Sequence, residues 1–311
     1  MKNNVIRFDH FLTYTNAANI DDYLEEYTRQ GFIPHEETVR HDPGLRNGFI
    51  GFGPEYIEFC WVEDEALFAA AGAEEKLLRT TPRPFGLGMV ADDVQAVHDS
   101  WVARGYSVPE VWSKAPRDAS FDSPPMWGFQ DIPNELLPGA ACFVLTYHTR
   151  RIDEVKQIKL SPNTSYAISG VTFVTAEPEA RATCWRNLLA PGEQVHHSGT
   201  GFHVWIGPHQ ARWITSEAYQ ISYGLNWLPF AYPIGELGLL HLLASDLRVA
   251  KTMLEQAGRR TFPVSVKGEE ELLIAPDARD GFSFIIRQQP IEVWLQERMA
   301  RTGEKLKLGQ D

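Results

Sequence analysis

The chain has 311 residues, of which 43% are hydrophobic and 23% charged, and its net charge at pH 7 is -12. This is the composition of a folded globular protein, rich enough in aromatic residues to fill large cores and long enough for two or more domains. The acidic balance argues against a nucleic-acid partner, because the basic residues cluster only in a short tail at Arg301, Lys305 and Lys307.

Membrane and secretory features are missing from the sequence. No apolar stretch is long enough to span a bilayer, and the first ten residues contain no apolar signal segment. We therefore expect a cytoplasmic protein without a membrane partner. Cys60, Cys142 and Cys184 stand alone in apolar surroundings, so we interpret them as buried thiols, with neither a disulfide framework nor a zinc site.

A repeating unit with a period of roughly 70 to 80 residues organises the chain. Each unit begins with a short apolar strand, continues with a helix that often ends at glycine, and closes with several more strands. In the first unit we predict a strand at 5–13, a helix at 20–30 and strands at 32–40, 47–52 and 55–62. In the second we predict a strand at 85–90, a helix from Asp93 to Gly105 and strands near 108–112, 126–129 and 140–147.

The second half of the chain follows the same plan. The third unit has a predicted strand at 169–175, a helix after Glu177-Pro178 and strands near 195–198, 201–206 and 210–216. The fourth has a strand at 239–244, a helix at 247–256 and strands near 261–266, 271–274 and 282–288, and a helix at 291–301 follows it. We expect a half at 1–150 with modules 5–65 and 84–148, a linker at 151–166, and a half at 167–311 with modules 168–222 and 237–289.

A direct match between two units supports duplication. Residues 48–54 align with residues 201–208 with one insertion, and this alignment places Glu58 opposite Arg212. The alternative is that Gly-Pro only marks a hairpin turn in each unit. We favour duplication because the match lies at the same place in both.

These motifs and their order resemble a known superfamily. Phe8-Asp9-His10-Phe11, then a helix, then Asn47-Gly48-Phe49 and Tyr56-Ile57-Glu58-Phe59, is similar to the glyoxalase-like branch of the vicinal oxygen chelate superfamily, which includes glyoxalases, bleomycin-resistance proteins and extradiol dioxygenases. The resemblance is good over 5–62, fair over 84–148 and architectural over 168–289. It implies an α+β fold in which four tandem βαβββ modules pair into two cup-shaped mixed sheets with helices outside.

The resemblance also implies a metal site. His10 matches the first-strand ligand, Glu58 the last-strand ligand and catalytic carboxylate, and His241 the first-strand ligand of the fourth unit. The equivalent positions elsewhere are Gly86, Phe143, Gly170, Arg212 and either Phe284 or Ile285, none of which binds a metal. Two imidazoles and one carboxylate suit a divalent cation such as Fe2+, Mn2+, Zn2+ or Ni2+ with open positions for substrate.

Each candidate also has a structural interpretation. A lone histidine on an apolar strand is commonly a satisfied core or rim residue. A buried Glu58 could be neutralised by Arg40 or Arg46 instead of a metal. Asn47, Tyr56 and His148 are candidates for substrate binding, and turn or rim roles are at least as compatible with their positions. Four histidines of the third unit, His196, His197, His203 and His209, match no compact metal signature and are interpreted mostly as structural or exposed.

Three functions follow. The first is a metal-dependent lyase, isomerase or dioxygenase that acts on a small oxygenated substrate, as a monomer or homodimer; the second is a non-catalytic small-molecule binder; the third is a structural or regulatory module. Pairing of neighbouring modules is the default. The distribution of ligands instead favours pairing the first module with the fourth, because this brings His10, Glu58 and His241 into one cup.

Overall fold

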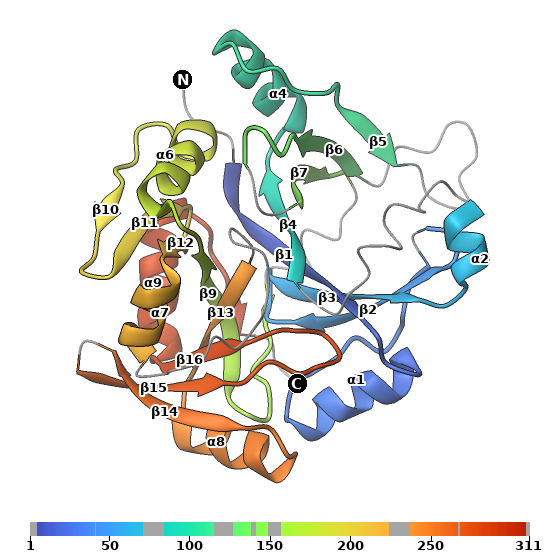
Figure 1. Cartoon of the computed structure of the whole chain (residues 1–311), viewed down its shortest axis with the longest axis vertical. Coiled ribbons are helices and arrows are strands. Elements are labelled where there is room, and N and C mark those ends of the chain that lie inside the picture. Colours follow the sequence, from blue (N-terminus) through green and yellow to red (C-terminus); the bar gives the residue numbers. More distant parts are fainter. Residues whose placement is uncertain are drawn as a thin grey trace.

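A computed structural model describes residues 5–40, 42–70, 84–114, 127–137, 141–148, 157–223, 237–266 and 268–308. Within them the chain forms a seven-stranded sheet, an eight-stranded sheet and a small two-stranded sheet (Figure 1). Both large sheets mix parallel and antiparallel pairs. The α+β fold with four βαβββ modules in two cup-shaped sheets is therefore confirmed. Residues 151–156 of the predicted linker lie outside the described residues.

The first sheet has the order β2-β3-β1-β4-β7-β6-β5. Its first module consists of β1 (Val5–Thr15), α1 (Ile20–Arg29), β2 (Leu45–Gly51) and β3 (Tyr56–Val62), followed by the short helix α2 (Glu65–Phe68). Its second module consists of β4 (Pro84–Ala91), α4 (Val94–Ala103), β5 (Trp112–Lys114), β6 (Trp127–Ile132) and β7 (Ala141–Tyr147). The first strands of the two modules, β1 and β4, pair antiparallel at the centre.

The second sheet has the order β10-β11-β12-β9-β13-β16-β15-β14. The third module consists of β9 (Ser165–Val174), α6 (Pro178–Leu189), β10 (His196–His197), β11 (Gly201–Ile206) and β12 (His209–Ile214), and α7 (Ser216–Tyr223) follows it. The fourth consists of β13 (Leu237–Ala244), α8 (Leu247–Gln256), β14 (Thr261–Val266), β15 (Glu269–Ile274) and β16 (Phe284–Gln288). Helix α9 (Ile291–Thr302) then leads to β17 (Lys307–Leu308), which pairs with β8 (Gln157–Ile158).

The module helices begin where the sequence predicts. Asn19, Asp93 and Asp246 each precede a helix and accept hydrogen bonds from its first backbone N–H groups. Such caps satisfy donors that have no partner inside the helix. Capping therefore marks the start of α1, α4 and α8 in the sequence itself.

Some predicted strands are shorter or shifted. Residues 32–40 contribute only isolated bridges at Pro34 and Val39, and residues 108–111 form no strand before β5. Pro34 and Pro109 have no N–H to donate, which weakens a ladder at both places. Helix α7 was not predicted, because its eight residues are too few to show a clear helical repeat of apolar positions.

The prediction that the first module pairs with the fourth is wrong. Modules one and two share the first sheet, and modules three and four share the second. Neighbouring modules have the shorter connection, as chain connectivity generally favours. The outer modules do contact each other through side chains. Tyr23 and Tyr27 of α1 both donate to the Asp280 carboxylate just before β16, and Arg279 pairs with Glu26 at 2.7 Å.

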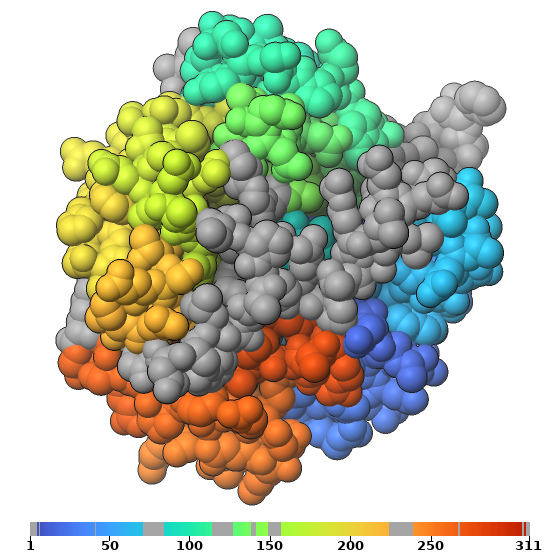
Figure 2. Space-filling model, in the orientation of Figure 1, coloured from blue at the N-terminus to red at the C-terminus, as the bar shows by residue number. Residues whose placement is uncertain are grey.

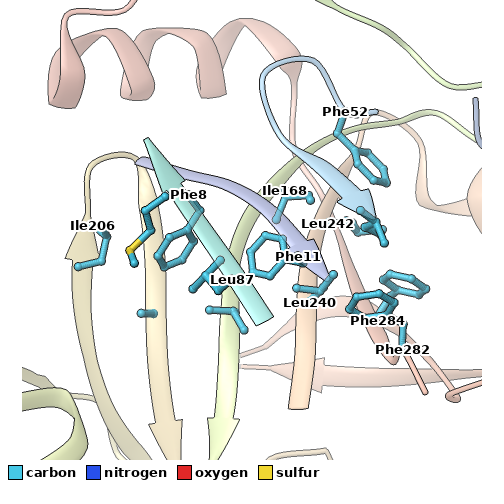
Figure 3. Close-up of a cluster of buried hydrophobic side chains, with 14 of the residues drawn as sticks. Phe8, Phe11, Phe52, Leu87, Ile168, Ile206, Leu240, Leu242, Phe282 and Phe284 are labelled. Carbon is cyan, nitrogen blue, oxygen red and sulfur yellow. The ribbon is translucent and has the colours of Figure 1, made fainter. Parts of the chain in front are cut away.

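The two sheets share one hydrophobic core. Phe11 and Leu87 of the first sheet lie in the same buried cluster as Ile168, Leu240 and Leu242 of the second (Figure 3). The buried faces of all four module helices join this cluster. In the space-filling view the first half covers the upper and right parts of this face of the molecule, and the second half covers the left and lower parts (Figure 2).

A buried ionic network also joins the halves. Glu55, fully buried before β3, forms an ion pair with Arg298 of α9 at 2.7 Å and lies 3.2 Å from Nε2 of His209. Since Nδ1 of His209 accepts the Phe8 N–H at 3.2 Å, the ring proton sits on Nε2 and points to Glu55. Burial acts to raise the pKa of Glu55, but Arg298 and His209 outweigh it and lower that pKa. The carboxylate therefore stays ionised.

Two further observations concern the thiols and the helices. Cys60 and Cys142 are buried as predicted, but Cys184 is exposed, because it lies on the solvent side of α6 while Ala182 and Trp185 face the core. Among the described helices, none has both the length and the apolar character needed to cross a membrane.

Candidate functional site in the first sheet

His10 and Glu58 lie together on one face of the first sheet. His10 is on β1 and Glu58 on β3, two parallel neighbours, and Nε2 of His10 is 3.7 Å from Oε2 of Glu58. Both side chains are buried. This face is opposite the shared core, because Leu87 and Met89 point into that core while Gly88 between them faces the His10 ring. We call it the first cup.

A β-bulge orients His10. Phe8 pairs with Met89 and His10 with Gly88, so β1 has one extra residue, Asp9, at this point. Neighbouring strand residues normally point to opposite faces. The bulge lets the Asp9 carboxylate reach Nδ1 of His10 at 2.8 Å. The other oxygen of the Asp9 carboxylate, Oδ1, pairs with the Arg7 guanidinium group at 3.0 Å.

The Asp9 carboxylate fixes the proton of His10. Burial acts to raise the pKa of Asp9, but the hydrogen bond from His10 and the charge of Arg7 outweigh it and lower that pKa. An ionised carboxylate only accepts hydrogen bonds, so Nδ1 of His10 is the donor. In the neutral ring, Nε2 then carries a free lone pair directed at the side of Glu58.

Glu58 has no full counter-charge. Its Oε1 accepts from the Asn47 amide, and no lysine or arginine of the described residues lies within 4.0 Å of the carboxylate. The alternative partners are engaged elsewhere, since Arg40 pairs with Glu63 at 2.6 Å and Arg46 with Asp21 at 2.9 Å. A buried carboxylate beside only a neutral amide and an imidazole is costly. The site therefore favours an added cation.

Two tyrosines complete the cup. Tyr56 stacks on His10 with ring centroids 4.7 Å apart, and it hydrogen-bonds to Tyr147. Tyr147 in turn donates to Oδ2 of Asp9 at 2.6 Å. Burial, with the nearby carboxylates, raises the pKa of both tyrosines well above the usual value. Both hydroxyls therefore stay protonated and act as hydrogen-bond donors.

Gly88 makes room for His10. A Cβ atom at Gly88 would lie 2.4 Å from Cε1 of His10, far inside contact distance. On the other side Phe143 of β7 packs against the ring with centroids 5.3 Å apart. The imidazole is thus held between the β4 backbone, Phe143 and Tyr56, which leaves it little freedom to rotate.

The structure brings four of the predicted site residues together and leaves two apart. His10, Glu58, Asn47 and Tyr56 form the first cup. His148 is exposed at the end of β7, and its Nε2 lies on the face that packs against α4, beside the position of a Cβ on Gly128. His148 therefore faces away from the cup.

His241 belongs to the other sheet. It pairs with Gly170 and Ile285, and its Nε2 is 2.7 Å from Oγ1 of Thr172. Its neighbours Leu240 and Leu242 point into the shared core, so His241 faces away from that core on the far side from His10. The structure therefore does not assemble His10, Glu58 and His241 into one ligand set, and no group of three or more potential metal ligands occurs among the described residues.

The donors of the first cup fit a cation held by two protein groups. A metal bound at roughly 2.0–2.2 Å from each donor requires those donors to lie within about 4.4 Å of one another. The separation of 3.7 Å between His10 and Glu58 meets this condition. Asp9 behind His10 supplies the carboxylate–histidine support that metal-bound imidazoles commonly have. The carboxylate of Glu58 would gain the charge partner that it lacks.

Sequence reasoning missed Asp9, Tyr147 and Gly88. Asp9 stood beside His10 in the motif, but strand alternation argued against contact between neighbours, and no sequence signal marks the bulge. Tyr147 is distant in sequence and reaches the site only through the central β1–β4 pairing. Gly88 in Gly86-Leu87-Gly88 was a visible signal, since a glycine inside a strand indicates close approach of another group.

Comparisons with known proteins agree with this architecture. The model of a family described as a glyoxalase-like domain matches residues 8–189. No curated protein matches the chain. A hypothetical protein from Staphylococcus aureus superposes with a TM-score of 0.58 at 10% identity, covering 91% of this chain and 99% of its own.

Two solved enzymes have the same fold. The 2,3-dioxygenase LapB from Pseudomonas sp. KL28 superposes with a TM-score of 0.54 at 11% identity, covering 93% of this chain and 94% of its own. A variant of 4-hydroxymandelate synthase from Streptomyces coelicolor also gives 0.54 at 11% identity, with 98% and 99% covered. At these identities the likeness concerns the fold alone.

Proposed function

The chain belongs to the glyoxalase-like domain family, whose model matches more than half of it, and on this basis we propose that the protein is a metal-dependent enzyme acting on a small oxygenated substrate. The observation that carries the proposal is the approach of His10 Nε2 to Glu58 Oε2 at 3.7 Å, with Nδ1 of the same imidazole bonded to Asp9. These two side chains would hold a divalent cation such as Fe2+, Mn2+, Zn2+ or Ni2+. A bound divalent cation acts as a Lewis acid on substrate oxygens.

The protein groups have separate tasks in this proposal. Asp9 keeps the His10 proton on Nδ1, so that Nε2 remains a donor of electrons. Asn47 holds one oxygen of Glu58 and leaves the other directed at His10. The Tyr56 hydroxyl, which bonds to Tyr147 in this structure, would turn to orient an oxygen of the substrate. Since the described residues supply only two ligands, substrate oxygens and water would complete the coordination.

Metal binding is the direct test. We expect isothermal titration with Mn2+ or Zn2+ to give one site per chain in the wild type, with affinity reduced at least tenfold in Glu58→Gln, because glutamine keeps the shape and removes the charge. Glu63→Gln, five residues after Glu58 and paired with Arg40, is the matched control and should bind as the wild type does. Equal affinity of Glu58→Gln and wild type would contradict the proposal.

A non-catalytic small-molecule binder is the second candidate. It is favoured by the finding that the described residues offer two metal ligands and no third. A screen of small oxygenated compounds against the wild type and the Glu58→Gln variant separates the two candidates. A binder would keep its affinity for the ligand both in the metal-free protein and in the Glu58→Gln variant. The proposed enzyme would lose turnover in that variant and after chelation of the metal.

A further inference from the structure

The second sheet carries a counterpart of the first cup with the opposite charge. In the first sheet, His10 of β1 pairs with Tyr56, and Leu12 pairs with Glu58. In the third module, Gly170 of β9 pairs with Gln210, and Thr172 pairs with Arg212. The same step along both strands therefore places Arg212 where the first module has Glu58. The alignment made from sequence alone had matched the same two residues.

The fourth module repeats this exchange. His241 of β13 pairs with Ile285, and Leu243 pairs with Arg287. This register makes Arg287 the counterpart of Glu58, which corrects the expectation that Phe284 or Ile285 holds that position. The strand pairing also changes the counterparts in the second module. Gly88, not Gly86, corresponds to His10, and Leu145, not Phe143, corresponds to Glu58. We call the face of the second sheet that carries His241, Arg212 and Arg287 the second cup.

The two guanidinium groups of the second cup are not neutralised by close carboxylates. Arg212 donates to Oγ1 of Thr200 at 2.6 Å and Arg287 to Oε1 of Gln289 at 2.7 Å, both uncharged acceptors. Within the described residues no carboxylate oxygen lies within 4.0 Å of either group, and Nε of Arg212 is buried with no hydrogen-bond partner. Both side chains are half-buried, where an unpaired cation is costly.

The remaining groups of the second cup are neutral or weakly acidic. Burial, together with the charges of Arg212 and Arg287, lowers the pKa of His241 to about 3, so its ring is neutral at pH 7. Glu271, across from Arg287 on β15, is the nearby carboxylate, and burial raises its pKa although both arginines oppose this. Glu271 therefore lies nearby without forming an ion pair within 4.0 Å with either guanidinium group.

Hydroxyl groups surround this positive charge. Thr172 bonds to His241, and the Tyr223 hydroxyl of α7 contacts both Thr172 and Arg212. Burial raises the pKa of Tyr223 to about 12, so it remains a donor. Arginine forks match the planar, multiply accepting geometry of carboxylate and phosphate groups, and hydroxyl donors add to such sites.

We propose that the second cup binds the oxyanion group of a small molecule, a carboxylate or a phosphate, between Arg212 and Arg287. The anion would bind in the second sheet at the place that corresponds to the proposed metal site of the first sheet. Its charge compensates the two guanidinium groups, and Nε of Arg212 gains an acceptor. The site is distinct from the first cup, because the shared hydrophobic core lies between them (Figure 3).

Isothermal titration of the full chain with succinate, acetate and inorganic phosphate, in a low-salt buffer free of other oxyanions, tests the proposal. We expect one saturable site per chain for at least one probe, with affinity weakened at least tenfold in Arg212→Met and in Arg287→Met. Binding of succinate and acetate identifies a carboxylate site, and binding of phosphate alone identifies a phosphate site. Absence of saturable binding for all three probes would overturn the proposal.

Controls separate a specific site from general charge and from folding. Arg248→Met, an exposed arginine of α8 in the same half, should bind the anion as the wild type does, and equal weakening in this variant would overturn the proposal. If a methionine variant does not fold by circular dichroism, Arg212→Lys and Arg287→Lys keep the charge but lose the fork, and each should still weaken binding. Glu58→Gln should leave anion binding unchanged, so failure of the first-cup proposal is distinguishable from failure of this one.

Discussion

His241 should make the stability of the protein depend on pH in a measurable way. Its pKa falls from 6.5 to about 3 in the folded state, first because of burial and then because of Arg212 and Arg287. The unfolded chain therefore binds a proton near pH 6.5 that the folded chain does not bind. Stability from this residue is present above pH 6.5 and is lost as the pH falls below it, down to about pH 3.

The size of the effect follows from this difference. Between pH 7 and pH 5, protonation of one histidine in the unfolded state alone lowers the free energy of unfolding by about 2 kcal/mol. Glutamine at this position retains an amide that reaches Thr172 but does not titrate. The loss of stability between pH 7 and pH 5 should therefore be about 2 kcal/mol smaller in His241→Gln than in the wild type.

Urea unfolding at pH 7 and pH 5, followed by circular dichroism, measures this difference. Other groups that titrate in this range, including His209, contribute equally to both proteins and cancel in the comparison. If His241→Gln loses as much stability as the wild type between these pH values, the reasoning about the charged surroundings of His241 is refuted.

Three other substitutions test the first cup and the network between the halves. Asp9→Asn should lower the affinity for Mn2+ roughly 10–100-fold in calorimetry, because His10 loses the carboxylate that fixes its ring. Gly88→Ala should lower that affinity about tenfold or more, since the new Cβ would lie 2.4 Å from Cε1 of His10 and displace it. Arg298→Met should lower the free energy of unfolding in urea by about 3–5 kcal/mol, because it leaves the buried Glu55 carboxylate without its guanidinium partner.

Matched variants accompany these tests. Tyr147→Phe removes a hydroxyl bond to Asp9 while keeping the carboxylate, and it should cost less metal affinity than Asp9→Asn. Gly86→Ala adds the same atom two residues away on β4, where the nearest contact is 3.1 Å to Leu12, and it should leave metal binding near the wild-type value. Adding Glu55→Gln to Arg298→Met should recover part of the lost stability, since the isolated charge is removed. If the matched variant loses as much metal affinity or stability as the variant it accompanies, or more, the corresponding interpretation is contradicted.

Much of the fold could be predicted from the sequence because its signals are local. Asn19, Asp93 and Asp246 mark helix starts through contacts within a few residues, and apolar alternation marks the strands. Repetition of this pattern identified four modules without any knowledge of contacts between them. The resemblance to the vicinal oxygen chelate superfamily implied that His10 and Glu58 lie on neighbouring strands, and the structure puts their side chains 3.7 Å apart.

The partners of these residues were decided by tertiary structure. The first sheet could have joined module one to module two or to module four, and the βαβββ pattern is the same in either case; the observed pairing separates His241 from His10. The Asp9–His10 contact depends on a bulge that only the β1–β4 register reveals. The charge of the second cup depends on the register that aligns Arg212 and Arg287 with Glu58. Sequence periodicity determines which face of a strand is buried, whereas register between strands distant in the chain is set by how the whole core packs.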